Sequence, residues 1–298
     1  MRIAFTGKGG SGKTTVSSLF SRLAGAEGYR VLALDADINQ HMAQAIGYIG
    51  ELRSMGAEAE LIKEYLRGSN PYIAAGEVHK TTPPGNGSRL LTLRDDDWFI
   101  REFAIKKENV FIVGAGDIPE GNIGVRCYHG LNGAVELVLG HMIDKQEDLI
   151  VVDMTAGADA FSSSLFTKVD VLVMVVEPTL KSLSVYEQFH KHMTDYGVPI
   201  VIVGNKVHDE DDKKFITMCV GSVAAWIPPA ESVRSRERGD MTDAIEDDIR
   251  EQLGGLRDQL LTVPIDWKRR EELSHRMHMR AVEHPQIDKS FSLVDAAL

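Results

Sequence analysis

A glycine-rich run near the start of the chain constrains its fold more than any other feature. The run Gly7–Thr14 (GKGGSGKT) satisfies the pattern G-x-x-x-x-G-K-[ST] at every fixed position. A short apolar segment, Ile3–Phe5, precedes it, and the segment Thr14–Ala26 that follows has helical spacing of its apolar residues. A strand, a glycine-rich loop and a helix in this order make a phosphate-binding unit, because the loop amides and the helix N-terminus face the negative charge.

The residue types in the loop suit the phosphate chain of a nucleotide bound with magnesium. Glycines let the backbone N–H groups curl around phosphate oxygens. Lys13 can reach the β- and γ-phosphates, and the hydroxyl of Thr14 can ligate magnesium. The nucleotide-binding residues that we expect here are Gly7, Gly9, Gly10, Ser11, Gly12, Lys13, Thr14 and Thr15.

The predicted strands are continuous apolar runs, which is typical of strands that are buried on both faces of a parallel sheet. They are Val31–Leu34, Val110–Val113, Leu149–Val152, Val171–Val176 and Ile200–Val203, with a last strand at Val220–Ile227. Helical segments alternate with them at Leu131–Ile143, Ala158–Phe166, Ser182–Tyr196 and Glu210–Met218. This alternation predicts an α/β fold with a doubly wound, mainly parallel sheet and helices on both faces.

The chain divides into a nucleotide-binding domain over residues 1–239 and a helical C-terminal extension over 240–298. Within the domain, residues 48–109 are irregular, and we expect an insertion that is folded against the core, with one helix at Glu58–Arg67 and a loop at Lys80–Ser88. The extension should hold helices at Asp243–Leu260, interrupted near its two adjacent glycines, and at Trp267–Glu283. The last residues should be mobile.

Composition limits the compartment and the partners. The chain carries a net charge of −11 and only two cysteines, Cys127 and Cys219, which favours a reducing compartment. With no basic-then-apolar leader and no apolar run of the ~20 residues that span a bilayer, we expect a cytoplasmic protein. The acidic balance argues against nucleic acid without excluding a local basic groove. The end at Ser290–Leu298 is short and has no lysine or arginine, so a cationic membrane-binding helix is not predicted.

Lys8 gives the loop a more specific signature. The sequence K-G-G-x-G-K-T resembles the deviant Walker A motif of the MinD/ParA class of ATPases, which includes the CooC-like maturation factors. The resemblance implies a magnesium-dependent ATPase that converts ATP and water to ADP and phosphate. It also implies a homodimer that encloses ATP, in which Lys8 crosses the interface to the partner's nucleotide. From composition alone, Lys8 would be a solvated loop cation.

Two acidic segments match the same class. Asp37 ends the run Leu34–Asp37, which resembles the switch I segment D-x-D, and the resemblance implies that its carboxylate positions the attacking water. Ile150–Gly157 resembles the Walker B strand and switch II, so that Asp153 would hold magnesium and the N–H of Gly157 would face the γ-phosphate. The simpler interpretation of the first segment is a turn or a helix cap.

The base site is predicted from two loops that follow apolar strands. Asn205 lies where the family has an asparagine that contacts adenine, and Ile227–Ala230 resembles the second base-edge loop, with Pro228 as its candidate residue. His208 stands at the fourth place of the segment that is N-K-x-D in GTPases, so guanine specificity is not indicated. A turn residue after a strand is the alternative for Asn205.

Cys127 and His129 are candidates for a second metal site. CooC-like proteins carry a C-x-C pair near this place, and this chain keeps one cysteine with a histidine two residues later. One such pair from each subunit of a dimer would supply two thiolates and two imidazoles to a transition metal such as zinc. A partly buried cysteine beside a loop histidine is the alternative.

Three biological roles fit these features. The first is an ATP-driven switch that serves maturation or delivery for a partner protein, as in the CooC-like factors. The second is a ParA-like partition ATPase that binds DNA, although the net charge of −11 disfavours DNA binding. The third is an ATP-dependent ligase or kinase for a small molecule, with the Lys80–Ser88 loop at its pocket.

Overall fold

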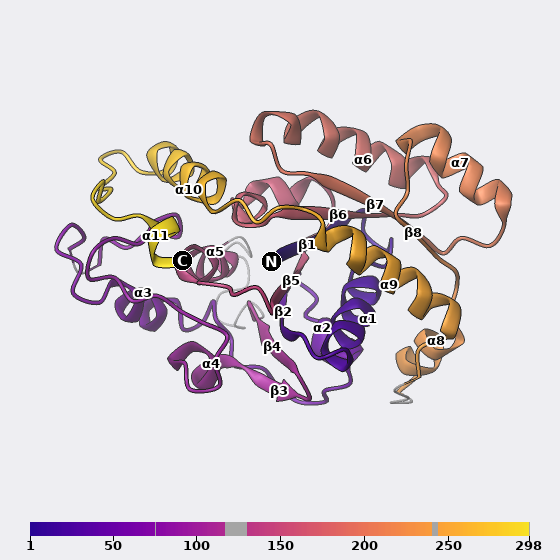
Figure 1. Cartoon of the computed structure of the whole chain (residues 1–298), viewed down its shortest axis with the longest axis horizontal. Helices are drawn as coiled ribbons and strands as arrows, with labels where there is room; N and C mark the ends of the chain where they lie inside the picture. The colour runs from indigo at the N-terminus through magenta and orange to yellow at the C-terminus, as the bar shows by residue number, and fades with distance from the viewer. Residues whose placement is uncertain (75, 117–129, 240–243, 298) are drawn as a thin grey trace.

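A computed structural model gives the fold over residues 1–74, 76–116, 130–239 and 244–297, with the side chains of 158, 159 and 162 left aside (Figure 1). Within these ranges the strands form one eight-stranded sheet in the order β3-β4-β2-β5-β1-β6-β7-β8. Its strands are β1 (Arg2–Gly7), β2 (Arg30–Ala36), β3 (Ile105–Lys107), β4 (Val110–Gly114), β5 (Asp148–Met154), β6 (Val171–Val176), β7 (Ile200–Asn205) and β8 (Ala225–Ile227).

The sheet is parallel except at one edge. β3 pairs with β4 in antiparallel fashion, and the other neighbours are parallel. The central strands β1, β5 and β6 are buried along their whole length, as the continuous apolar runs predicted. The predicted α/β class with a doubly wound, mainly parallel sheet is therefore confirmed.

Helices cover both faces, and each face has its own apolar cluster. One face packs α1 (Lys13–Ala26), α2 (Met42–Ile46), α8 (Glu231–Glu237) and α9 (Asp247–Leu261) against side chains such as Ile3 and Phe5 of β1. The other face, on the side of Ala4, packs α3 (Ala59–Arg67), α4 (Trp98–Phe103), α5 (Asn132–His141), α6 (Leu180–Met193), α7 (Glu210–Val220) and α10 (Trp267–Ala281). No helix in the described ranges is long and apolar enough to cross a membrane.

Residues 48–109 join the apolar cluster of the second face. Met55, Ile62, Leu66 and Phe99 are buried together with residues of β2 and α5. The segment also holds α4 and β3, which the sequence did not predict. The charged stretch before α4 is not merely solvated, because Asp97 caps that helix by accepting a hydrogen bond of 2.9 Å from the Phe99 N–H.

Two expectations for individual elements are wrong. Residues 157–168 form two short 3₁₀ helices, Gly157–Ser162 and Leu165–Lys168, instead of one α-helix. The Thr167 hydroxyl there donates to the Ser164 carbonyl at 2.7 Å, and such side-chain bonds compete with regular helix bonds. The strand expected at Val220–Ile227 starts only at Ala225, because α7 continues to Val220 and ends at Gly221, whose φ is +81°.

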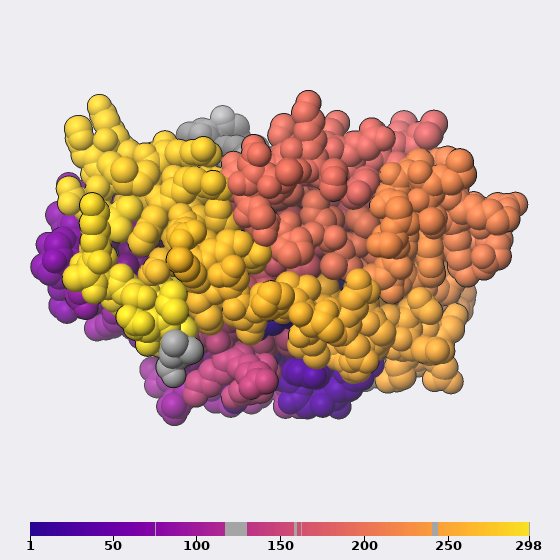
Figure 2. Space-filling view, turned by 45° about the horizontal axis from the view of Figure 1, so that its top comes forward, coloured from indigo at the N-terminus to yellow at the C-terminus, as the bar shows by residue number. Residues whose placement is uncertain are grey.

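The C-terminal extension is more regular than predicted. α9 begins at Asp247 and runs without a break through its two glycines, since Leu253 and Leu256 on either side of them are fully buried. The chain end forms a further short helix, α11 (Leu293–Ala297), whose Leu293 is buried. In Figure 2 the extension, orange to yellow, runs as a continuous strip across the face in view.

A buried ionic network ties the extension to the amino ends of the central strands. Arg2 of β1 and Arg270 of α10 each bond Asp144 at 2.9 Å. Arg270 also donates from Nε to Asp170, just before β6, at 2.9 Å. All four side chains are almost fully buried. Burial alone would raise the pKa of Asp144, but the two guanidinium groups outweigh it and hold that pKa far below its usual range. The network thus fixes α10 to the sheet.

Replacing Arg270 by Met should lower the free energy of unfolding by about 3–5 kcal/mol, because it leaves buried carboxylates without their cation. Urea unfolding followed by circular dichroism measures this change. Lys268→Met, on the exposed part of the same helix, is the control and should cost less than about 1 kcal/mol. Equal stability of the two variants would contradict the role of the network.

A buried histidine should make the fold sensitive to acid. Burial lowers the pKa of His141 to about 4, the hydrogen bond to the Leu137 carbonyl opposes that shift, and the charge of Lys168 adds to it. As the pH falls, His141 therefore takes up a proton near pH 6.5 in the unfolded chain, whereas it stays neutral in the folded chain. The stabilising contribution is complete above pH 6.5 and is lost as the pH falls toward 4, by about 3 kcal/mol in all.

His141→Gln should flatten this part of the pH profile, whereas His190→Gln, on the exposed side of α6, should leave it unchanged. Urea midpoints at half-unit steps between pH 4 and 7 make the comparison. A wild-type slope in the His141 variant would show that other groups cause the acid sensitivity.

Candidate nucleotide-binding site

The candidate site lies at the carboxyl ends of five neighbouring strands. β1 leads into the glycine-rich loop, β2 ends at Asp35–Asp37, and β5 carries Asp153 as its last residue but one. β6 is followed by Glu177, and β7 ends at Asn205. Because these strands are parallel, their carboxyl ends meet at one edge, where open α/β sheets bind ligands.

The loop Gly7–Thr14 takes a conformation that needs glycine. Gly10 and Gly12 have φ values of +81° and +90°, in the left-handed region. A methyl group at Gly12 would also lie 2.1 Å from the side-chain nitrogen of Asn205. That nitrogen donates to the Ser11 carbonyl at 2.7 Å, so β7 braces the loop directly.

Thr14 and Asp153 offer oxygen ligands for magnesium. The Thr14 hydroxyl donates to Asp153 Oδ2 at 2.5 Å, and Asp153 is fully buried. Among the described residues no donor reaches its other oxygen, Oδ1. Burial raises the pKa of Asp153 to about 7, against the effect of Thr14 and the charge of Lys13, and the carboxylate of Asp37 adds to the rise. A buried carboxylate oxygen without a donor, beside a hydroxyl, fits a hard cation.

Asp35 and Asp37 shape the segment after β2. Asp35 accepts from the backbone N–H groups of Asp37 at 3.1 Å and Met42 at 2.8 Å, and thereby closes the turn into α2. Asp37 accepts two hydrogen bonds from Asn39, at 3.0 and 2.9 Å, and its Oδ2 lies 3.9 Å from Lys13 Nζ. The carboxylate of Asp37 is therefore held in a fixed orientation beside the loop lysine.

The segment after β5 is bonded to the segment after β2. The Thr155 hydroxyl donates to the Ala36 carbonyl at 3.2 Å, and Asn132 at the start of α5 donates to the same carbonyl at 3.1 Å. Gly157 follows with φ +66°. If either segment moves, it must therefore break these hydrogen bonds or move the other segment with it.

Lys8 lies in a cluster of charges at the rim. Its ammonium group donates to Glu177 at 3.1 Å, and Lys206 reaches the other oxygen of Glu177 at 3.3 Å and the Gly10 carbonyl at 2.5 Å. Burial alone would raise the pKa of Glu177, but the hydrogen bonds from the two lysines outweigh it and lower that pKa. Glu177 thus holds Lys8 close to the loop.

A pocket of about 370 Å³ lies beside the loop and brings together the residues predicted for the base. Thr15, Asn205 and Pro228 line it, together with Lys206, His208, Ile227, Pro229, Ala230, Val233, Arg234 and Glu237. Because the nitrogen of the Asn205 amide is bound to a carbonyl, its oxygen is left as the acceptor for a ligand, such as the amino group of a base.

Two predicted residues cannot be placed, and two contributors were not predicted. Cys127 and His129 lie outside the described residues, and within the described ranges no group of three or more His, Cys, Asp or Glu side chains is arranged to hold a metal. The turn given as the simpler interpretation of Leu34–Asp37 is formed by Asp35. Glu177 and Lys206 were not predicted to contribute. Glu177 directly follows an apolar strand, and that position could have identified it.

The braced loop gives a test of the glycine requirement. Gly12→Ala should lower the free energy of unfolding of the nucleotide-free protein by about 1–3 kcal/mol, because its φ and its contact with Asn205 both exclude a methyl group. Gly9→Ala is the matched control, since the nearest atom to its new methyl group, Ala156 Cβ, is 3.8 Å away. Equal urea midpoints for the two variants would contradict this account of the loop.

Comparisons with known proteins identify the family of the chain. Residues 3–277 match the family described as the CobQ/CobB/MinD/ParA nucleotide binding domain. An uncharacterised ATP-binding protein of Methanocaldococcus jannaschii is 32% identical over 242 residues, which cover 80% of this chain and 88% of that protein. The carbon monoxide dehydrogenase accessory protein CooC of Rhodospirillum rubrum is 30% identical over 218 residues, 72% of this chain and 78% of that protein.

Solved structures show the same fold. The cell division ATPase MinD of Pyrococcus furiosus superposes with a TM-score of 0.58 at 17% identity, over 87% of this chain and 99% of that chain. A ParA family ATPase from Chlorobium tepidum gives 0.57 at 16% identity, over 85% and 95%. The chain therefore belongs to the CobQ/CobB/MinD/ParA nucleotide-binding family and carries the deviant P-loop of its MinD/ParA-type ATPases.

Proposed function

We propose that the protein hydrolyses magnesium-bound ATP to ADP and phosphate and uses the nucleotide to switch between a monomer and a homodimer. The observation that carries the proposal is the contact of Thr14 with Asp153, whose second oxygen is buried without a donor among the described residues. Lys13 and Asp37 lie at the same edge of the sheet. This is the set of groups that phosphoryl transfer requires.

Each residue at this edge has one role in the proposed reaction. Lys13 and the loop amides bind the phosphates, and Thr14 and Asp153 hold magnesium. The metal, when bound, offsets the charge on the phosphate oxygens. Asp37 accepts a hydrogen bond from the attacking water and orients it toward the γ-phosphate, since Asn39 already fixes the direction of its carboxylate.

The dimer is supported by residues at the rim of the site. Lys8 is the signature lysine of the class, and Glu177 holds it beside the loop at 3.1 Å. Two large apolar side chains close in sequence to the site are exposed. Ile38, which follows Asp37, is 46% exposed, and Leu180, three residues after Glu177, is 75% exposed. A second subunit that covers the rim of the site would also cover these two side chains.

The role that we favour is that of an accessory ATPase for a partner protein. The similarity to CooC, a carbon monoxide dehydrogenase accessory protein, supports it. The net charge of −11 disfavours the alternative of DNA partition. Lys8 disfavours the small-molecule ligase or kinase, because the resemblance gives this lysine a role only in a dimer. Cys127 and His129 stay candidates for a metal shared between the subunits.

Asp37→Ala should trap the dimer, because ATP binds but the water is not oriented. Hydrolysis should fall by about 100-fold or more, and the mass in solution should double with ATP and magnesium but not with ADP. Light scattering after gel filtration and a phosphate-release assay measure the two effects. Chelating magnesium should abolish both hydrolysis and the dimer.

Three further variants complete the experiment. Adding Lys8→Ala to Asp37→Ala should prevent the ATP-dependent dimer while ATP still binds, and Lys181→Ala, on the exposed start of α6, should have no effect. Lys13→Ala should remove ATP binding altogether. A monomer in every state would refute the switch, and wild-type hydrolysis by Asp37→Ala would remove Asp37 from the mechanism.

A further inference from the structure

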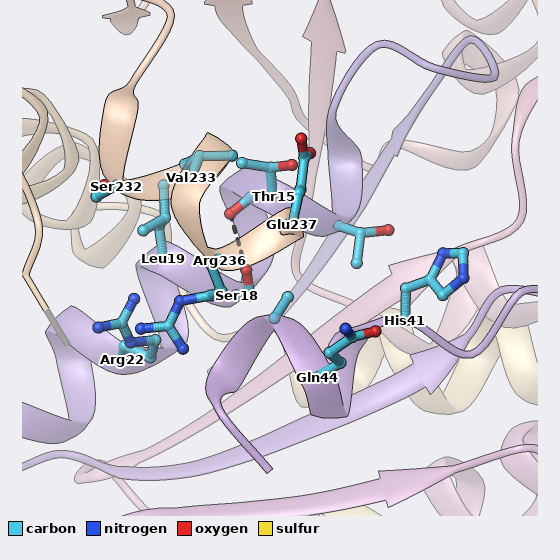
Figure 3. Close-up of a pocket in the computed structure, with 12 residues that line it drawn as sticks. Thr15, Ser18, Leu19, Arg22, His41, Gln44, Ser232, Val233, Arg236 and Glu237 are labelled. Atoms are coloured by element: carbon cyan, nitrogen blue, oxygen red, sulfur yellow. Dashed lines mark hydrogen bonds between the residues drawn. The ribbon is translucent and has the colours of Figure 1, made fainter. Parts of the chain in front are cut away.

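Two cavities of the structure stand in different relation to the nucleotide site. The cavity between α1, α2 and α8 (Figure 3) is lined by Thr14 and Thr15, so it is part of the nucleotide site. Another cavity, of about 410 Å³, lies beside residues 199–202 at the amino end of β7. It is at the opposite end of that strand from Asn205, and we call it the β7 slot.

The slot exists because β8 is shorter than β7. β6 pairs with every residue of β7 except the last, whereas β8 pairs only with the final part, Val203 to Asn205. Along residues 200–202, β7 therefore has a described strand on one side and the slot on the other. Ile200 and Val201 are only half-buried, although the neighbouring strand β6 is buried along its whole length.

Backbone groups of β7 face the slot without a strand to pair with. The Leu172 N–H donates to the Pro199 carbonyl at 2.9 Å, so the backbone of Pro199 points toward β6. Successive residues of a strand alternate, and the backbone groups of Ile200 and Ile202 therefore point into the slot. The Ile202 carbonyl accepts from the Ala224 N–H at 2.8 Å, but within the described ranges no strand lies beside the Ile202 N–H and the two groups of Ile200. Such groups are a template for a further strand.

The slot has a wall on each face of the sheet. Tyr186 and His190 of α6, whose ring centroids lie 5.6 Å apart, form part of one wall, and Gln259 of α9 lies on the other. Along β7 itself, Ile200 packs into the apolar cluster on the α6 face and Val201 into that on the α9 face. A strand in the slot would direct its side chains alternately to the two walls in the same way. The shape of the slot therefore favours an extended chain.

The lining of the slot is uncharged. None of the fourteen described residues that line it is Asp, Glu, Lys or Arg, although these four types make up 26% of the chain. A charge brought into the slot would lose water without gaining an ion-pair partner, which costs free energy. The segment that fits is therefore uncharged, with small polar or apolar side chains.

The described strands of this chain do not supply such a segment to a second copy. The two edge strands of the sheet are β3 and β8. β3 carries Lys106 and Lys107 among its three residues, and the uncharged slot offers them no partner. The Trp226 N–H of β8 is already bonded to Gln252 Oε1 of α9 at 2.9 Å. The occupant that fits is therefore a segment of another protein.

We propose that the β7 slot binds an uncharged, extended peptide segment of a partner protein, which adds to the sheet as a short strand. Its backbone pairs with Ile200 and Ile202, and its side chains alternate between the wall of Tyr186 and that of Gln259. Addition of a strand to an open sheet edge is a general mode of peptide recognition. The slot stands on the geometry of β7 and does not depend on the proposed ATPase activity.

The test is a nuclear magnetic resonance titration of the full chain with the peptide acetyl-Thr-Val-Thr-Val-Thr-amide. The peptide should bind with a Kd of about 1 mM or tighter and shift the amide signals of residues 199–202. The Ile200 and Ile202 amides should exchange hydrogen rapidly in the free chain and about tenfold or more slowly with the peptide. The Val201 amide, which faces β6, should exchange slowly in both states.

Two N-methylated peptides test for strand pairing. In an extended peptide alternate N–H groups face the same side, so methylation at both valines and methylation at the central threonine affect opposite sides. One of these peptides should bind about tenfold or more weakly than the parent peptide, and the other should bind as the parent does. Equal binding by both would show that the peptide backbone does not pair with β7.

A substitution in the lining tests the place of binding. Ser222→Arg puts a long, charged side chain at an exposed position of the slot, so it should weaken peptide binding about tenfold or more while circular dichroism stays unchanged. Ser184→Arg, near the exposed start of α6 and outside the slot, should bind the peptide as the wild type does.

The outcomes separate the slot from the nucleotide switch. The absence of peptide binding, or binding that Ser222→Arg leaves intact, would overturn the proposal. Self-association of the chain without nucleotide, which the peptide then reverses, would identify a second copy as the occupant and overturn the assignment to a partner. Lys13→Ala should bind the peptide as the wild type does, so a failure of the proposed ATPase or its dimer leaves this test intact.

Discussion

The parallel register of three strands is the constraint on which the site depends. In the sheet Asp153 of β5 lies opposite Phe5 of β1 on one side and Asp35 of β2 on the other. The glycine-rich loop starts two residues after Phe5, and Asp37 comes two residues after Asp35. One register therefore fixes the distance between the phosphate loop, the acid beside Thr14 and the acid beside Lys13. A shift by one residue would move every one of these side chains to the other face of the sheet.

This register brings two buried acids together, and that arrangement costs free energy. Burial raises the pKa of Asp35 well above its usual value, and the charge of the neighbouring Asp153 raises it further. The hydrogen bonds that Asp35 accepts from two backbone N–H groups oppose this rise. The pKa of Asp153 is raised as well. Buried like charges are tolerated where a ligand supplies the opposite charge. A bound cation would favour the ionised form of both, so the cost falls when the site is loaded with magnesium and nucleotide.

The sequence predicted what depends on local pattern and missed what depends on packing. The loop Gly7–Thr14 and the central strands could be found because each has its own spacing of glycines or apolar residues. α4 could not, since it is only six residues long and its signal, the cap from Asp97, looks like a charged loop. Glu177 and Lys206 follow strands that are far from the loop in the sequence, and only the strand order β1-β6-β7 brings them beside it.

The amino ends and the carboxyl ends of the strands differ in how their side chains are bonded. At the amino ends, Arg2, Arg270, Asp144 and Asp170 close on each other in the interior, and such a network rigidifies because every member has its partner. At the carboxyl ends, the loops are connected to one another by hydrogen bonds, such as those from Thr155 and Asn132 to the Ala36 carbonyl. α1, α2 and α8 start from those loops, so their positions depend on the carboxyl ends of the strands, whereas α10 is held at the amino ends.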